Sequence, residues 1–293
     1  MTDRDRFADY RARLEAIGFR PKRRFGQNFL LEPALHDEVA EAAGVKERDL
    51  VLEVGAGLGF LTRELASRSE RVVAAEIDPL LVEFLRTELP SWPHHERIQI
   101  VPGDVLANGE LSTDLVAALG QPDPEHFCVA ANLPYAVSGP CLAAMMTSPL
   151  PVARRMGLLV QLEFAERICA KPGTAEFSGP TALVQSVFEP RLRRRVSGEV
   201  FRPRPNVVSA IVELRARPDA PLLTADVDTR RRFAEFVRAV HAQRRKRFGR
   251  GLERASARLG RDYGAPPELL DRRPAEISGP ELFELFAAGE TRS

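Results

Sequence analysis

Short apolar runs alternate with amphipathic segments through the first half of the chain. The apolar runs that predict buried strands are residues 50–54, 71–77, 98–101, 127–131 and 156–160. The segments with helical periodicity are residues 33–44, 60–68, 79–89, 139–146 and 164–170. Strands that alternate with helices assemble into a parallel sheet with helices on its faces. We therefore predict an α/β fold for this part of the chain.

The pattern changes towards the carboxyl terminus. Three apolar runs close together predict later strands and an antiparallel end to the sheet, at residues 184–188, 192–196 and 208–214. A proline-bounded linker follows at residues 218–221, after which helical periodicity returns at residues 230–246, 253–259 and 280–288. We predict one α/β domain over residues 1–217 and a small all-α domain over residues 218–293.

The composition is that of an ordinary soluble globular protein, with 293 residues, 44% of them hydrophobic and 28% charged. The charged amino terminus and the absence of any run of about 18 apolar residues favour a cytoplasmic protein without a membrane segment. Cys128, Cys141 and Cys169 do not have the spacing of metal ligands, so we expect reduced thiols and no metal site. Nothing in the sequence suggests an obligate oligomer, and we expect a monomer.

The net charge of +1 conceals a strong separation of charge along the chain. Residues 31–190 carry 11 Lys and Arg against 23 Asp and Glu, whereas residues 191–260 carry 19 against 7. A basic segment beside an acidic one indicates a polyanionic partner, such as RNA, bound at one side with salt-sensitive affinity. The alternative is a solvated helical face.

A glycine-rich loop, residues 53–59 (Glu-Val-Gly-Ala-Gly-Leu-Gly), lies between the first strand and the next helix. Glycines there let a ligand approach the backbone closely. A dinucleotide fingerprint would place its third glycine at position 60, which is Phe60. Glycines at positions 55, 57 and 59 fit S-adenosylmethionine better, and a dinucleotide-dependent oxidoreductase is a remote alternative.

Polar residues end the next three strands, at Glu76, Asp104 and Asn132. The carboxyl ends of parallel strands meet at one edge of a sheet, where open α/β folds bind ligands. We expect Glu76 to accept both ribose hydroxyls of the cofactor. Asp104 is then placed to accept the adenine amine of the cofactor, with the backbone of Val105 contacting the ring edge.

The tetrapeptide Asn132-Leu133-Pro134-Tyr135 has the groups needed to make an exocyclic aromatic amine nucleophilic. The Asn132 side-chain oxygen and the Leu133 carbonyl can each accept one N–H of adenine N6 and so orient its lone pair. Pro134 stiffens the turn, and Tyr135 can stack on the base. The alternative is a simple turn with Tyr135 in the core.

Together these features resemble the ribosomal RNA adenine N6 dimethyltransferases, and within them the bacterial small-subunit dimethyladenosine transferase family, across nearly the whole chain. Beyond the loop, strand ends and tetrapeptide, the resemblance rests on residues 24–30, 161–173, 201–210 and 243–246. It implies a Rossmann-like class I S-adenosylmethionine-dependent methyltransferase with a small all-α carboxy-terminal domain.

The resemblance also implies roles for individual residues. Gln27, Asn28 and the backbone near Leu30 contact the methionine part of the cofactor, beside Gly55 and Gly57. Phe201 stacks on the flipped adenine opposite Tyr135. The basic residues expected to contact RNA phosphates are Arg202, Arg204, Arg244, Arg245, Lys246 and Arg247.

The implied activity is methyl transfer to N6 of two adjacent adenosines near the 3′ end of 16S rRNA, on the small ribosomal subunit, without a catalytic metal. Two alternatives remain open at this point: a macrolide-resistance enzyme that modifies large-subunit RNA, and a small-subunit assembly factor with weak or no methylation. Departures from the usual family pattern surround the target side, at Ala136, Leu162, Phe177-Ser178-Gly179-Pro180 and Val208.

Overall fold

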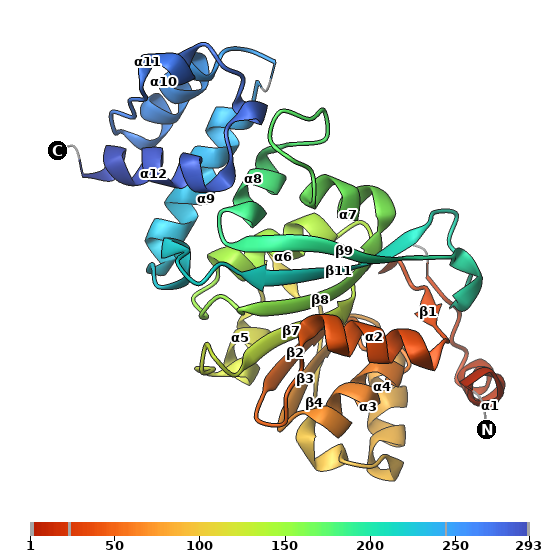
Figure 1. Ribbon diagram of the computed structural model, residues 1–293. Coiled ribbons are helices and arrows are strands. Elements are labelled where there is room, and N and C mark those ends of the chain that lie inside the picture. The colour runs from red at the N-terminus through yellow and green to blue at the C-terminus, as the bar shows by residue number, and fades with distance from the viewer. Residues whose placement is uncertain (1–2, 23–24, 244, 292–293) are drawn as a thin grey trace.

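A seven-stranded sheet with the order β4-β3-β2-β7-β8-β11-β9 forms the centre of the computed structural model (Figure 1), which describes residues 3–22, 25–243 and 245–291. Its strands are β2 (Leu50–Val54), β3 (Arg71–Glu76), β4 (Ile98–Pro102), β7 (Phe127–Asn132), β8 (Arg155–Gln161), β9 (Phe188–Val196) and β11 (Ser209–Ala216). Strands β4 to β8 in this order are parallel, and β11 pairs antiparallel with both β8 and β9. The predicted α/β fold with an antiparallel end is therefore confirmed.

Helices cover both faces of the sheet because its strands are apolar on both sides. One face packs against α2 (Pro33–Ala43), α3 (Phe60–Arg68) and α4 (Pro79–Glu88). The other packs against α5 (Thr113–Leu119), α6 (Ser138–Thr147), α7 (Leu162–Ile168) and α8 (Gly179–Gln185). Alternate residues of β2 enter the two cores: Val51 faces the first set of helices, and Leu52 faces the second.

Helix α2 lies unusually close to the middle of the sheet at Gly157 of β8. A Cβ atom at this glycine would lie 2.3 Å from the carbonyl oxygen of Val39 and 2.3 Å from the backbone nitrogen of Ala43. A side chain cannot be accommodated at that distance unless α2 moves. The backbone of α2 therefore rests directly on β8.

The strand predicted over Val184–Phe188 is wrong. Val184 lies in the last turn of α8, and Phe188 begins β9. The helix starts at a capping box in which Ser178 and Thr181 exchange hydrogen bonds, with Pro180 in the first turn. A short apolar run does not by itself distinguish a strand from a buried helical turn.

Several short elements were not predicted. They are α1 (Asp3–Ala16), β1 (Phe29–Leu30), β5 (Leu106–Ala107), β6 (Glu110–Leu111), α5, β10 (Phe201–Arg202) and α11 (Pro267–Leu270). Two-residue strands carry no periodicity to read. The pairing of β1 with β10 joins segments more than 170 residues apart, which only the tertiary fold brings together.

The carboxy-terminal helices α9 (Val227–His241), α10 (Phe248–Leu259) and α12 (Gly279–Glu290) stack beside α6 and α8 (Figure 1). Phe233, Phe236 and Phe286 pack together between them, with ring centroids 5.4 to 6.4 Å apart. This cluster is continuous with the core of the sheet. The all-α composition of the region agrees with the prediction, whereas the boundary at residue 217 stays a prediction.

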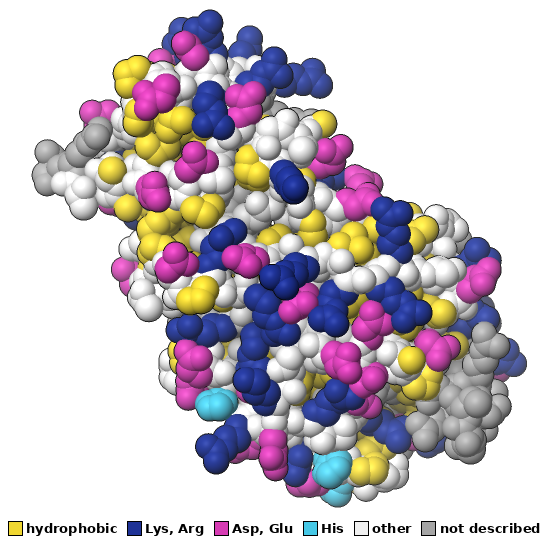
Figure 2. Space-filling view, in the orientation of Figure 1, with side chains coloured by type: hydrophobic (Ala, Val, Ile, Leu, Met, Phe, Trp, Pro, Cys, Tyr) yellow, Lys and Arg dark blue, Asp and Glu magenta, His cyan; other side chains and the backbone are white. Residues whose placement is uncertain are grey.

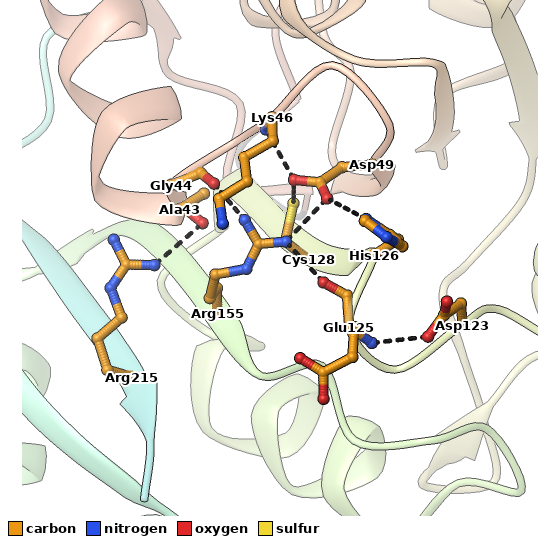
Figure 3. A network of polar contacts seen from close by, with 10 residues as sticks. All are labelled: Ala43, Gly44, Lys46, Asp49, Asp123, Glu125, His126, Cys128, Arg155 and Arg215. Carbon is orange, nitrogen blue, oxygen red and sulfur yellow. Dashed lines mark hydrogen bonds and ion pairs between the residues drawn. The ribbon is translucent and has the colours of Figure 1, made fainter. Parts of the chain in front are cut away.

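A polar network ties the amino-terminal edge of the sheet together (Figure 3). Asp49, which is fully buried just before β2, accepts hydrogen bonds from Arg155 Nη2 at 2.8 Å and from the backbone N–H of Lys46 at 2.7 Å. Arg155 also donates to the carbonyl oxygens of Gly44 and Glu125. The buried carboxylate therefore has a cationic partner and a backbone donor.

Over the described ranges, no helix combines the length and apolar character needed to cross a lipid bilayer. Basic and acidic side chains are interspersed on the face shown in Figure 2. Part of the basic run on the edge strand β9 is paired, because Arg193, Arg194 and Arg195 form ion pairs with Glu213, Glu38 and Glu166. Sequence counting alone therefore overstates the free positive charge of this strand.

Candidate active site

A cavity opens at the carboxyl-terminal edge of the sheet, beyond the ends of β2, β3 and β7. It is lined by residues 25–30, the glycine-rich loop with the start of α3, residues 76–77 at the end of β3 and the tetrapeptide 132–135, together with His36 of α2 and Leu81 of α4. Sequence reasoning predicted that the glycine loop, Glu76 and Asn132 would meet at this edge. The structure brings these three together.

Two glycines of the glycine-rich loop that line the cavity have backbone conformations that require glycine. Gly55 and Gly57 have φ angles of +82° and +57°, a region that disfavours other residues. A Cβ atom on Gly57 would also lie 3.3 Å from Cδ1 of Phe29, which lines the cavity. The loop turns so that the Gly57 N–H donates to Glu76 Oε2 at 2.8 Å.

Glu76 is held in place by backbone donors. Its side chain is buried, and its second oxygen, Oε1, accepts from the N–H of Asp78 at 2.9 Å. Burial raises the pKa of this carboxyl, and the two backbone hydrogen bonds oppose that rise. Each carboxylate oxygen can accept a further hydrogen bond, so the geometry suits recognition of a pair of hydroxyls.

Glu53 is a site residue that sequence reasoning missed. It lies in β2, lines the cavity and is only 1% exposed. Its Oε2 has no hydrogen-bond partner among the described residues, and burial raises its pKa to about 8. The available signal was an acidic residue inside an otherwise apolar strand. A buried carboxyl oxygen without a donor is ready to accept one from a ligand.

The tetrapeptide is fixed by contacts on both sides. Asn132 Nδ2 donates to the carbonyl oxygen of Asn28 at 3.2 Å. This bond fixes the amide, and no donor among the described residues occupies its Oδ1. The Leu133 N–H donates to the carbonyl oxygen of Leu159 at 3.0 Å, and Leu133 itself is buried. The Pro134 carbonyl accepts from Ser138 Oγ at 3.1 Å.

Tyr135 lines the cavity, and its hydroxyl lies 2.7 Å from Ser209 Oγ. Ser209 is fully buried at the start of β11. Burial raises the pKa of the Tyr135 hydroxyl. This hydrogen bond therefore holds the ring to the sheet at its hydroxyl end, beside the cavity that the residue lines.

Phe201, which is predicted to stack on the target base, does not line the cavity. Phe201 is fully buried, pairs with Leu30 across β1 and β10, and packs in the core with Val39 of α2. Its stacking on the target base stays a prediction.

The other predicted cofactor residues divide into two groups. Gln27, Asn28 and Leu30 line the cavity. Asp104 is exposed and its Oδ1 accepts from the Leu106 N–H at 2.9 Å, while Val105 is buried in the core, and neither lines the cavity. Their contact with the cofactor stays a prediction.

The predicted RNA-binding residues lie at two places. Arg202 and Arg204 are exposed next to β10, where Arg202 donates to the carbonyl oxygen of Glu199 at 2.8 Å. Arg245, Lys246 and Arg247 are exposed between α9 and α10. Arg247 is paired with Asp271 at 2.7 Å. Arg244 lies outside the described residues, as does Arg24 in the amino-terminal segment.

Two of the departures from the family pattern are neighbours in space. The backbone N–H of Leu162 donates to the carbonyl oxygen of Val208 at 2.9 Å, and Val208 is 46% exposed beside Ser209. Ala136 is exposed directly after Tyr135, whereas Phe177 is fully buried against His241. The exposed departures, Ala136 and Val208, are therefore each adjacent in sequence to one member of the Tyr135–Ser209 pair.

Comparison with known proteins decides the family. The model described as "Ribosomal RNA adenine dimethylase" matches residues 18–262. The chain belongs to this family. It is 37% identical over 289 residues to the "Ribosomal RNA small subunit methyltransferase A" of Geobacillus thermodenitrificans, covering 93% of this chain and 94% of the relative. The relative of the same name from Rubrobacter xylanophilus is 38% identical over 274 residues, with 91% and 94% covered.

Solved structures agree with this family assignment. A dimethyladenosine transferase from Plasmodium falciparum is similar in fold, with a TM-score of 0.67 at 21% identity over 89% of this chain and 96% of that chain. The 23S rRNA methyltransferase ErmE has a TM-score of 0.59 at 27% identity, covering 89% of this chain and 100% of its own. The Rossmann-like methyltransferase fold expected for the family is therefore confirmed.

Proposed function

We propose that this member of the family transfers methyl groups from S-adenosylmethionine to N6 of adenines in small-subunit ribosomal RNA. The observation that carries the proposal is the hydrogen bonding of the Asn132 side chain. Its amide nitrogen is engaged by Asn28, and its oxygen is left as an acceptor at the cavity, one residue from the Leu133 carbonyl. Two acceptors so close together match the two N–H groups of an adenine amine.

The residues of the cavity fit the proposed cofactor. Glu76 offers a fixed pair of oxygens to ribose hydroxyls, and the left-handed Gly55 and Gly57 let a ligand approach the loop. Glu53 adds a buried carboxyl oxygen without a hydrogen-bond partner among the described residues, and a cationic amino group beside it would favour its ionised form. When bound there, S-adenosylmethionine supplies an activated methyl group.

The contribution of the protein is then orientation and electrostatics. The Asn132 oxygen and the Leu133 carbonyl hold the amine with its lone pair directed into the cavity, and both stabilise the positive charge that develops on nitrogen. The Tyr135 ring, held by Ser209, supports the base from one side. After one methylation the amine retains one N–H, so a second transfer at the same nitrogen is chemically possible.

The target base must leave its stack to reach this site, which costs a few kcal/mol and favours a loop or helix end in RNA. We propose that two adjacent adenosines near the 3′ end of 16S rRNA meet this requirement on the small ribosomal subunit. Arg202 and Arg204 lie nearest the site, and the exposed residues between α9 and α10 extend the contact to more distant phosphates. We propose that the protein acts in the cytoplasm as a monomer.

The test is methyl transfer from labelled S-adenosylmethionine to unmethylated small subunits, naked small-subunit RNA and large-subunit RNA, followed by nucleoside analysis. We expect N6,N6-dimethyladenosine in the small-subunit substrate alone. Label in large-subunit RNA would place the chain with the resistance enzymes. Binding of cofactor and subunit without transfer would identify an assembly factor instead.

A further inference from the structure

The cover of the cavity is joined to the loop after β3 through one buried carboxylate. We call residues 25–31 the covering segment. Asp78 is fully buried; its Oδ2 accepts from Gln27 Nε2 at 2.9 Å, and its Oδ1 accepts from Lys22 Nζ at 3.1 Å. Gln27 Oε1 in turn accepts from the backbone N–H of Lys22 at 2.6 Å. Both ends of the Gln27 amide are therefore occupied within the protein.

Asp78 also connects to the part of the site that faces the ribose. Its N–H donates to Glu76 Oε1, and the other oxygen of Glu76 accepts from Gly57. Its side chain caps α4 by accepting from the Leu80 N–H at 3.2 Å. An unbroken series of hydrogen bonds thus runs from the covering segment through Asp78 and Glu76 to the glycine-rich loop.

We propose that Asp78 is a positioning residue for cofactor binding, which holds the covering segment closed through Gln27 and Lys22. In this arrangement Gln27 acts through Asp78 and does not contact the cofactor directly. The inference deepens the proposed function and rests on it. Hydrogen bonds to a buried charge are stronger than neutral ones, and closing the segment beforehand lowers the cost of ordering it when a ligand binds.

The experiment measures the affinity for S-adenosylhomocysteine by calorimetry in full-length Lys22→Met, Gln27→Leu and the double variant. Lys46→Met is the matched control, since Lys46 is exposed at the opposite edge of the sheet. We expect each single variant to bind about fivefold to tenfold more weakly. The loss of affinity in the double variant should be smaller than the product of the two single losses, because both residues act on the same carboxylate.

Two further variants separate positioning from direct contact. Gln27→Glu places a second carboxylate against Asp78, so affinity should fall further than in Gln27→Leu. Direct contact with a cationic cofactor would instead make the added negative charge neutral or favourable. Lys22→Arg keeps the positive charge and should restore most of the affinity. In parallel, amide hydrogen exchange should rise over residues 25–31 in Lys22→Met and stay unchanged in the control.

The proposal is overturned if Lys22→Met leaves both affinity and exchange as in the wild type while Gln27→Leu weakens binding. That result would make Gln27 a direct cofactor ligand. Failure of the wild type to bind S-adenosylhomocysteine would instead contradict the proposed function. Hydrogen exchange in the same variants would still decide whether Asp78 holds the covering segment.

Discussion

Asp49 and Glu53 are two buried carboxyl residues four positions apart, at opposite edges of the same sheet, and their surroundings differ completely. Asp49 has Arg155 and a backbone N–H as partners, whereas one oxygen of Glu53 has none among the described residues. Burying a polar group without a partner is costly. The amino-terminal edge therefore stabilises the fold, and the carboxyl-terminal edge keeps unsatisfied groups available for a ligand.

The backbone shows the same contrast. At the cavity the chain turns through Gly55 and Gly57 in left-handed conformations, and the nearby Asn132 oxygen is kept open. At the other edge Asp49 accepts hydrogen bonds from Arg155 and from the Lys46 N–H, and His126 Nδ1 lies 3.6 Å from its carboxylate (Figure 3). A ligand-binding site contains strained or unpaired groups that lower the stability of the fold, and favourable packing elsewhere in the molecule offsets that loss.

The largest expected effect on stability follows from Asp49→Ala. Removing this carboxylate leaves Arg155 without its buried partner, and we expect the free energy of unfolding to fall by about 3 to 5 kcal/mol. Urea unfolding measures it, with the exposed Asp219→Ala as control. The contrast between the two edges would be contradicted if Asp49→Ala left the free energy of unfolding nearly unchanged. It would also be contradicted if the variant lowered cofactor affinity in the molecules that remain folded.

Asn132→Ala should lower activity strongly and stability only slightly, the opposite of Asp49→Ala. It removes the acceptor that orients the target amine, and we expect methyl transfer to slow about 100-fold to 1,000-fold. The free energy of unfolding should change by only about 1 kcal/mol, the value of one hydrogen bond. Single-turnover assays and urea unfolding give the two numbers. A loss of stability that matches the loss of rate would show that the residue is structural.

Glu53→Gln tests the unsatisfied carboxyl by its dependence on pH. The pKa of Glu53 is about 8 in the folded protein against a usual value of 4.5. Between pH 4.5 and pH 8, Glu53 is therefore protonated in the folded state and ionised in the unfolded state. Glu53 therefore lowers stability as pH rises from about 4.5 to 8. The variant should be about 3 kcal/mol more stable than the wild type at pH 7 and about 4 kcal/mol more stable at pH 8, and the gap should close towards pH 4.5.

Unfolding of both proteins across this pH range measures the difference between them. Parallel curves for the wild type and Glu53→Gln would mean that Glu53 has a donor in the folded protein. Loss of S-adenosylhomocysteine affinity in the more stable variant would show that stability and binding are in conflict at this residue.

The smallest effect is expected from Tyr135→Phe, which keeps the ring and removes one hydrogen bond to Ser209. The loss is about 1 kcal/mol, or roughly fivefold in methyl transfer. Ser209→Ala should have a similar effect, and the double variant should add little, since both remove the same contact. Additive losses would separate the two residues and contradict the attachment of the ring.

The parts of the site that sequence could predict are those set by local patterns. Glycine spacing after an apolar strand, and polar residues that end successive strands, predict residues that share one edge of a sheet. That prediction is confirmed for Gly55, Glu76 and Asn132, which line one cavity. The order of the strands within the sheet was not predicted from the sequence.

The features that the sequence could not predict have tertiary causes. Phe201 is buried because β10 pairs with β1, far away in the sequence. Both polar ends of the Gln27 amide are bound because Asp78 and Lys22 meet it, and no local pattern predicts that contact. The helix at Gly179–Gln185 was predicted in part as a strand, although Ser178 and Thr181 carry the signature of a helix start.

Gly157 has a wider consequence for the cavity than its place in the middle of β8 suggests. Because Gly157 has no side chain, the backbone of α2 packs directly against the backbone of β8. The first turns of α2 carry His36, whose Nε2 lies 3.2 Å from the carbonyl oxygen of Leu30 in the covering segment. The missing side chain at Gly157 thus sets how close to the sheet α2 lies, together with His36, which lines the cavity, and one added methyl group would push the helix outwards.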